Sequence, residues 1–180
     1  ERLMTAANSP NQGGRPLFSS TRFGNILGSS GSVIPIFRQQ IAMGGPVTLT
    51  DPSMTRFVMS IEQSVHLVID SVSLSKGGEV LITKMPVIKI RDLAEVMIQE
   101  LAGLYNYKPS DIDIIEIGTK PGEKLYEELM SDEEIRRAVE LDYFYSVLPA
   151  FRGIYRNIKY DYKKVVSDTV ENPYNSAVEK

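Results

Sequence analysis

The residues of this sequence that could form a functional site are small, polar or cationic, and such residues commonly bind anions. Residues 28–32 read Gly-Ser-Ser-Gly-Ser, between a β-like run that ends at Asn25 and a helical pattern that begins near Ser32. Such a loop lets backbone N–H groups approach a ligand closely, and the N-terminus of the following helix adds partial positive charge. The pattern suits a phosphate or diphosphate, although a turn that only caps a helix has the same composition.

Other segments carry groups that could meet this loop at one site. Asn25 offers an amide to a sugar hydroxyl, an N-acetyl group or a phosphate, and Arg56 follows a short strand predicted at residues 47–50. A strand-end turn further along presents Lys120 and Glu123. A diphosphate requires cations together with N–H donors, and each charge-assisted hydrogen bond contributes about 1.5–3 kcal/mol. Arg56 and Lys120 are therefore the candidate diphosphate ligands.

Each of these residues also has a purely structural interpretation. Arg56 lies in a predicted strand between Thr55 and Phe57, so its side chain could point to solvent. Lys120 and Glu123 flank a Pro-Gly turn that could be entirely solvated. The spacing alone leaves both interpretations open.

Composition excludes several other classes of function. Twenty basic and 23 acidic residues among 180 give a net charge of −3, which provides no general attraction for nucleic acid or anionic membranes. Cysteine is absent, and the single histidine, His66, has no neighbouring partners in the sequence. Thiol catalysis, zinc–thiolate sites and a metal site are therefore not expected. No apolar run approaches the roughly 18 residues of a membrane helix, so we expect a cytoplasmic globular protein.

The elements that must position these residues alternate between strands and helices, which predicts an α/β protein with at least partly parallel strands. Helices are predicted at residues 1–8, 32–43, 61–73, 90–104, around 125–129, and at 131–141. Strands are predicted at residues 17–23, 47–50, 55–59, 79–83, 112–117 and 142–148. The helix at 61–73 has the stripe of a half-buried helix, formed by Ile61, Val65, Val68, Ile69 and Val72.

The beginning of the chain has a helical pattern without an initiator methionine or an N-cap before Glu1. We therefore interpret the chain as a fragment or a processed form, with residues 1–8 as the tail of a longer helix.

Three ordered motifs resemble the second half of the capsular polysaccharide biosynthesis family. They read TRFGNILGSSGSVIP at residues 21–35, TDPSMTRF at 50–57 and IGTKPGEKLYE at 117–127. Members of this family are extended short-chain dehydrogenase/reductase proteins, typified by UDP-N-acetylglucosamine 4,6-dehydratase. The resemblance extends from residue 1 to about residue 128, and residues 172–176 (Asn-Pro-Tyr-Asn-Ser) resemble the tail of the same enzymes.

The resemblance implies an α/β fold that is the C-terminal part of a Rossmann-type extended short-chain dehydrogenase/reductase with its smaller substrate-binding lobe. Residues 1–45 would be the end of the Rossmann domain with a substrate-facing loop and helix. Residues 46–148 would form a mixed α/β substrate-binding lobe, and residues 149–180 an irregular C-terminal tail.

The function implied is that of a lyase in surface polysaccharide biosynthesis, which converts UDP-N-acetylglucosamine to a 4-keto-6-deoxy sugar with NADP or NAD. In such enzymes the catalytic Tyr-x-x-x-Lys pair and the glycine-rich cofactor loop belong to the first half. Neither occurs here in the right context, so we expect no catalytic residue and no activity from this chain alone. Tyr160 and Lys164 have the spacing of the pair, but no cofactor loop precedes them.

The resemblance carries over substrate-binding roles for Asn25, Ser32, Val33, Thr50, Arg56, Lys120 and Glu123. By similarity, the first three lie along the substrate, Thr50 meets the uracil or ribose, Arg56 and Lys120 take the diphosphate, and Glu123 lies near the ribose. Phe23 and Gly24 would lie near the nicotinamide of the cofactor. The family turn usually reads Arg-Pro-Gly-Glu, and this chain has lysine at position 120. A lysine ammonium is a point charge, so it lacks the planar guanidinium with which arginine binds a phosphate through two hydrogen bonds.

Two alternatives stay open. One is a nucleotide-sugar 4-epimerase of the same superfamily, which would yield no 4-keto-6-deoxy product. The other is a non-catalytic module that binds a nucleotide-sugar or a protein. In either enzyme we expect a UDP-sugar as the partner, no nucleic acid, a homo-oligomer when the protein is complete, and membrane association only if helices precede this chain.

Overall fold

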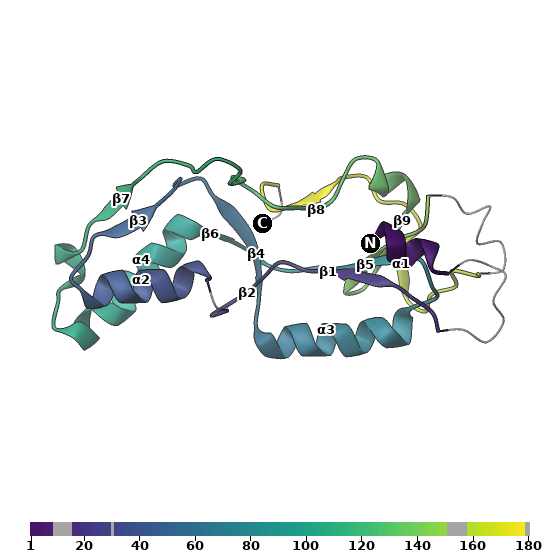
Figure 1. Ribbon diagram of the computed structural model, residues 1–180, viewed down its shortest axis with the longest axis horizontal. Coiled ribbons are helices and arrows are strands. Elements are labelled where there is room, and N and C mark those ends of the chain that lie inside the picture. The colour runs from purple at the N-terminus through teal and green to yellow at the C-terminus, as the bar shows by residue number, and fades with distance from the viewer. Residues whose placement is uncertain (9–15, 30, 151–157, 179–180) are drawn as a thin grey trace. The chain divides into compact units, whose positions relative to one another are not determined.

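The computed structural model describes residues 1–8, 16–29, 31–150 and 158–178 (Figure 1). Ser30 of the small-residue loop, residues 9–15 and part of the predicted tail lie outside the described residues. The chain folds into two compact units, each assembled from three segments. Unit 1 consists of Glu1–Phe23, Glu62–Met85 and Glu128–Asn175, and unit 2 of Gly24–Ile61, Pro86–Glu127 and Ser176–Lys180.

Unit 1 is built on a five-stranded mixed sheet. In spatial order its strands are β1 (Ser20–Arg22), β5 (Val80–Thr83), β10 (Phe144–Val147), β9 (Ala138–Leu141) and β11 (Val165–Ser167). β1 and β5 are parallel, and the other pairs are antiparallel. The interior strand β5, which lies between β1 and β10, buries Leu81 and Ile82 completely. The unit also contains α1 (Arg2–Ala6), α3 (Ile61–Leu74), the 3-10 helix η3 (Glu134–Arg137), and the antiparallel pair β8 (Glu128–Met130) and β12 (Tyr174–Asn175).

Helix α3 confirms the predicted helix, but the prediction of its buried face is wrong. Its buried residues are Ser64, Leu67 and Ser71. The small Ser71 lets the helix approach β1, where the Thr21 hydroxyl donates a hydrogen bond to Ser71 Oγ over 3.4 Å. The predicted aliphatic stripe, residues 61, 65, 68, 69 and 72, lies on the adjacent face and is 49–73% exposed. Periodicity identifies residues that share a face, but it does not identify what covers that face.

The helices predicted around residues 125–129 and at 131–141 are wrong. The chain there forms β8, a short 3-10 turn and β9. The Ser131 backbone N–H does donate to Glu134 Oε2 over 3.0 Å, as in a capping box. The helical turn nevertheless ends at Arg137, because the next three residues pair with β10 and tertiary strand pairing overrides local helix propensity.

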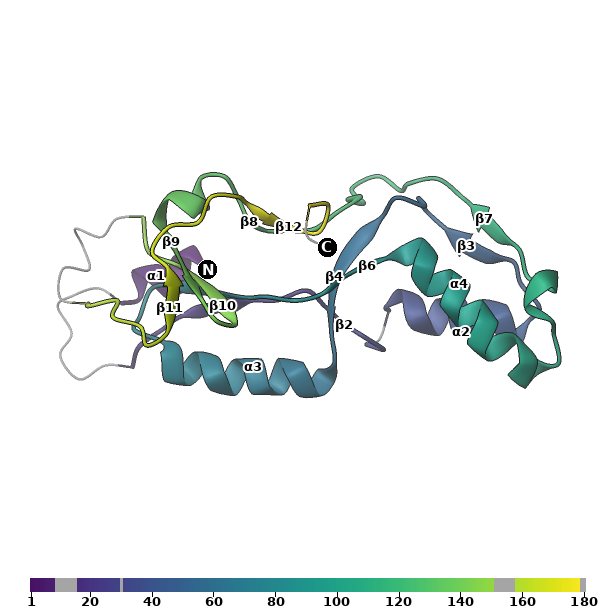
Figure 2. The ribbon, with the colours of Figure 1, turned by 180° about the vertical axis from the view of Figure 1, so that it is seen from behind.

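Unit 2 packs two helices side by side, α2 (Val33–Ala42) and α4 (Ile90–Leu101), as both Figures 1 and 2 show. Beside them lie the parallel strands β3 (Val47–Leu49) and β7 (Ile114–Glu116) and a second sheet in the order β2 (Asn25–Ile26), β4 (Thr55–Met59) and β6 (Val87–Lys89). Two 3-10 helices, η1 (Ala102–Tyr105) and η2 (Pro109–Asp111), follow α4. The fully or nearly fully buried core includes Phe37, Ile41, Val47, Leu49, Ala94 and Ala102.

The predicted α/β class is confirmed, with both parallel and antiparallel pairs. The compact units do not follow the predicted consecutive boundaries of 1–45, 46–148 and 149–180. The reason is that strands distant in sequence pair with one another, so each unit draws on all three regions. The assignment of a Rossmann end and a substrate-binding lobe to these ranges stays a prediction.

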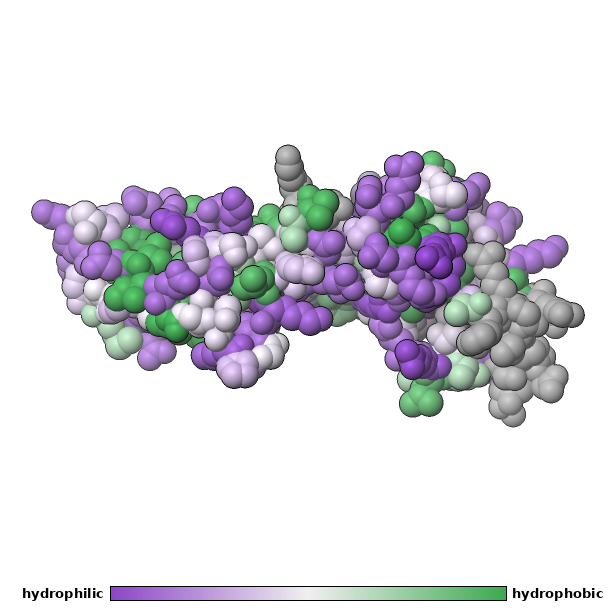
Figure 3. Space-filling view, turned by 90° about the horizontal axis from the view of Figure 1, so that it is seen from above, coloured by the Kyte–Doolittle hydropathy of each residue, from purple (hydrophilic) through white to green (hydrophobic). Residues whose placement is uncertain are grey.

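On the surface drawn in Figure 3, hydrophobic side chains are interspersed with polar ones. Within the described ranges, every helix is too short or too polar to cross a lipid bilayer.

Candidate functional site

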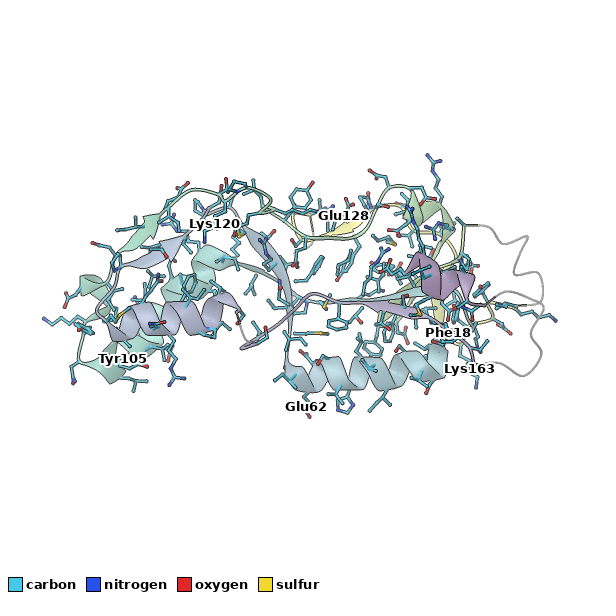
Figure 4. The ribbon with its side chains drawn as sticks, viewed as in Figure 1. Phe18, Glu62, Tyr105, Lys120, Glu128 and Lys163 are labelled. Atoms are coloured by element: carbon cyan, nitrogen blue, oxygen red, sulfur yellow. The ribbon has the colours of Figure 1, made fainter. Side chains whose placement is uncertain are left out.

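A cavity of about 380 Å³ in unit 2 is lined by all seven predicted substrate-binding residues. They are Asn25, Ser32, Val33, Thr50, Arg56, Lys120 and Glu123. They come from five places: strand β2, the start of α2, the residue after β3, strand β4, and the turn after β7. Figure 4 labels Lys120 in this turn. Apolar side chains of Phe37, Leu49, Met54 and Val58 complete much of the wall. Apolar walls with a few convergent polar groups are typical of small-molecule sites.

Ser32 and Val33, at the N-terminus of α2, line this cavity. Ser32 is the N-cap residue, but its hydroxyl makes no capping hydrogen bond. Its Oγ atom is buried and has no hydrogen-bond partner within the described residues. Because a buried polar atom without a partner is costly, a ligand that hydrogen-bonds Ser32 would be favoured. Gly28 and Gly31, with φ of 76° and 78°, adopt the left-handed backbone that this turn requires.

Arg56 is held in place by main-chain carbonyl groups. Its Nη1 atom donates to the carbonyl oxygens of Thr55 and Leu125 at 2.7 and 3.2 Å, and Nη2 donates to that of Lys124 at 2.8 Å. A guanidinium has five N–H donors, so two of them, on Nε and Nη2, make no hydrogen bond within the described residues, and Nε lies 4.0 Å from Glu127 Oε1. The side chain therefore does not simply point to solvent: it fixes the segment around Leu125 and keeps a charge on the cavity wall.

Thr50 and Glu123 connect the end of β3 to the turn after β7. The Thr50 hydroxyl donates to Glu123 Oε1 over 3.2 Å, and the Lys120 backbone N–H donates to Glu123 Oε2 over 3.3 Å. The Lys120 ammonium makes no hydrogen bond or ion pair within the part of the chain described here. Glu123 thus shapes the turn, and Lys120 is left free to meet an anion.

Glu127 is a residue of this region that the sequence did not single out. Its carboxylate accepts hydrogen bonds from Asn25 Nδ2 at 2.9 Å and from the Phe57 backbone N–H at 3.1 Å. Its only sequence signal is its place at the end of the motif at residues 117–127.

The two predicted cofactor residues, Phe23 and Gly24, do not line the cavity. Phe23 is 37% exposed. Gly24 lies so close to Phe57 that a Cβ atom at this position would be 2.5 Å from Phe57 Cβ and 2.6 Å from its carbonyl oxygen. Packing therefore explains the glycine, and contact with a nicotinamide stays a prediction.

Replacing Gly24 by alanine is expected to lower the free energy of unfolding by about 1–3 kcal/mol, because the added methyl group would overlap Phe57. Urea denaturation followed by circular dichroism measures the change. Gly103→Ala is the control, since no heavy atom lies within 4 Å of the added Cβ, and it should change stability by less than about 1 kcal/mol. Equal stability of the two variants would contradict the packing explanation.

The Tyr160 and Lys164 pair has structural contacts in unit 1. The Tyr160 hydroxyl donates to the Gly77 carbonyl oxygen over 2.7 Å, and Lys164 Nζ lies 3.7 Å from Asp142 Oδ2. His66 is exposed on α3. Among the described residues, no group of three or more histidine or acidic side chains is placed to hold a metal ion.

Comparison with known proteins identifies the chain's relatives. A family described as polysaccharide biosynthesis protein matches residues 1–149. An uncharacterized membrane protein of Methanocaldococcus jannaschii is 53% identical over 83% of this chain and 45% of its own. The capsular polysaccharide biosynthesis protein CapD of Staphylococcus aureus is 40% identical over 96% of this chain and 27% of its own.

Two further relatives extend the comparison. A UDP-glucose 4-epimerase of Rickettsia bellii is 40% identical over 82% of this chain and 41% of its own. The X-ray structure of Pen from Bacillus thuringiensis superimposes with a TM-score of 0.82 and 40% identity, over 99% of this chain and 50% of its own. The chain spans about half or less of the length of these relatives. With a family match over most of its length, it belongs to the polysaccharide biosynthesis protein family.

Proposed function

We propose that the cavity of unit 2 binds a UDP-sugar, and that the chain is the substrate-binding part of a nucleotide-sugar 4,6-dehydratase acting on UDP-N-acetylglucosamine. The single observation that carries the proposal is the convergence of Arg56, Lys120 and the N-terminus of α2 on one cavity. These are the cations and N–H donors that a diphosphate requires. The family's place in polysaccharide biosynthesis supports a sugar as the remainder of the ligand.

The part of this chain in the reaction would be to bind and orient the nucleotide-sugar. Arg56 and Lys120 would neutralise the diphosphate, the buried Ser32 hydroxyl would gain a partner, and the Asn25 amide would contact the sugar. NADP or NAD, bound by the whole protein, would supply the hydride transfer. Phe23 and Gly24 stay candidates for its nicotinamide end.

A 4-epimerase is the second candidate function, favoured by the relative named UDP-glucose 4-epimerase. Both reactions need the same diphosphate and sugar contacts, so the cavity supports either. A non-catalytic binding module would need only the cavity.

The product of the reaction distinguishes these candidates. The full-length protein that contains this sequence is incubated with UDP-N-acetylglucosamine and NADP or NAD, and the products are analysed by mass spectrometry and NMR. Loss of one water with formation of a 4-keto-6-deoxy sugar is the expected result. A C4 epimer of unchanged mass would establish the epimerase function. Recovery of unchanged substrate would favour the non-catalytic binding module.

A further inference from the structure

The carboxylate of Glu127 contacts β2 and β4, two elements of the cavity wall, but Glu127 is not one of the lining residues. Each of its two oxygens has its own neighbour in this wall. Oε1 accepts the hydrogen bond from Asn25 Nδ2 at 2.9 Å and lies 4.0 Å from Arg56 Nε, and Oε2 accepts the Phe57 backbone N–H at 3.1 Å. Glu127 therefore contacts two predicted ligand-binding residues without reaching the cavity itself.

The backbone of Glu127 is fixed by Ser176, which is completely buried. The Ser176 N–H donates to the Glu127 carbonyl oxygen over 2.8 Å, and the Glu127 N–H donates to Ser176 Oγ over 2.9 Å. Ser176 Oγ also lies 3.0 Å from the Thr55 hydroxyl and donates to the Thr55 carbonyl oxygen over 3.2 Å. The motif at residues 172–176 thus ends in a serine that is hydrogen-bonded both to Glu127 and to Thr55 at the start of β4.

The contact with Glu127 determines how the Asn25 amide is oriented. An ionised carboxylate only accepts hydrogen bonds, so the amide must turn its nitrogen toward Glu127. Asn25 Oδ1 then has no hydrogen-bond partner within the described residues, and it stays available as an acceptor. A sugar hydroxyl or an N-acetyl N–H is the kind of group that would donate to it.

Given the proposed function, on which this inference rests, we infer that Glu127 is a positioning residue for the sugar. It holds the Asn25 amide in one orientation before the ligand arrives. A side chain that is already oriented loses less conformational freedom on binding. Arg56 does not depend on this contact, because three main-chain hydrogen bonds hold its guanidinium. Glu127 therefore affects recognition of the sugar more than recognition of the diphosphate.

Glu127→Gln tests this role. The oxygen of glutamine can occupy only one of the two carboxylate positions, and the other position then carries an NH₂ group. Because the Phe57 N–H is fixed in the backbone and requires the oxygen at the Oε2 position, the NH₂ group faces Asn25, whose amide is expected to flip. Isothermal titration calorimetry measures the affinity of the chain for UDP and for UDP-N-acetylglucosamine. The affinity for UDP-N-acetylglucosamine should fall about tenfold, and the affinity for UDP by about twofold or less. Glu116→Gln makes the same charge change at an exposed residue of β7 and should alter neither.

A double-mutant cycle separates positioning from stability. In an Asn25→Ala background, Glu127→Gln should no longer change the preference for UDP-N-acetylglucosamine over UDP, since the amide it positions is absent. Equal loss of affinity for both ligands in Glu127→Gln would mean that the residue only supports the fold, and would overturn the inference. The inference would also be overturned if Asn25→Ala lowered the affinity for UDP as much as the affinity for UDP-N-acetylglucosamine. If the unmodified chain binds neither ligand, the proposed function itself fails.

Discussion

Replacing Arg56 by alanine is expected to weaken the binding of UDP-N-acetylglucosamine at least about tenfold, which is roughly 1.4 kcal/mol. Within the described residues, two of its N–H donors make no hydrogen bond, and its ion pair is a 4.0 Å contact with Glu127. Charge-assisted bonds to a diphosphate contribute about 1.5–3 kcal/mol each. The substitution also releases the carbonyl oxygens of Lys124 and Leu125, which loosens the segment beside the cavity. Isothermal titration calorimetry measures both affinity and stoichiometry.

Two variants complete this experiment. Arg56→Lys keeps the charge but cannot reproduce three carbonyl contacts from a planar fork, so its affinity should lie between those of the unmodified chain and Arg56→Ala. Arg91→Ala removes an exposed arginine of α4 whose one ion pair within the described ranges is with Glu95, and it should leave the affinity unchanged. If Arg56→Ala binds within about twofold of the unmodified chain, the diphosphate does not lie at Arg56.

The second large effect is expected on stability, at Arg22 in unit 1. Its guanidinium forms paired hydrogen bonds with the carboxylates of Glu1 and Glu134, at 2.7–2.9 Å, and donates to the Leu129 carbonyl oxygen. The Glu134 side chain is only 12% exposed. Arg22→Ala would remove the cation that is hydrogen-bonded to this carboxylate and leave only Arg137, whose Nη2 lies 3.8 Å from Glu134 Oε1. Removal of one partner of a buried pair costs about 3–5 kcal/mol, so a loss near the lower end of this range is expected.

Urea denaturation at neutral pH measures this loss of stability. The control is Lys164→Ala, because that exposed lysine lies 3.7 Å from Asp142 Oδ2, and an ion pair of this kind should contribute about 0–1 kcal/mol. Similar stabilities of the Arg22 and Lys164 variants would contradict the importance of the Arg22 network.

The same network predicts how stability depends on pH. Burial raises the pKa of Glu134, but hydrogen bonds from Arg22 and Ser131 outweigh it and hold the pKa below its ordinary value of 4.5. A carboxyl group with a lowered pKa in the folded state stabilises the fold fully above its unfolded pKa, and this stabilisation is lost as the pH falls through the folded pKa. The unmodified chain should therefore lose stability below about pH 4.5 more steeply than Glu134→Gln does.

The sequence predicted the elements whose signals are local. Composition and periodicity predict the small-residue loop before α2, the helix itself and the turn containing Lys120. The motif resemblance indicates which residues of these elements to expect at one site. The resemblance also gave the family, which the comparisons confirm.

Contacts between distant segments could not be predicted in this way. Arg22 and Glu134 are 112 residues apart, and Glu127 and Ser176 are 49 residues apart, so no local pattern joins them. The buried face of α3 also depends on contacts between distant segments. Its helical periodicity is predicted correctly, but the packing of Ser64 and Ser71 decides which face is buried. Local sequence predicts a helix where β9 forms, because the extended conformation there depends on pairing with β10.

The most direct test of the central claim, that the unit 2 cavity binds a UDP-sugar, is an NMR titration of the ¹⁵N-labelled 20.1 kDa chain with UDP-N-acetylglucosamine. The structure predicts saturable shifts of the backbone amide signals of Ser32, Val33, Thr50 and Lys120, which line the cavity, and these shifts should weaken in Arg56→Ala. Absence of shifts at saturating ligand, or shifts confined to residues of unit 1, would contradict the claim.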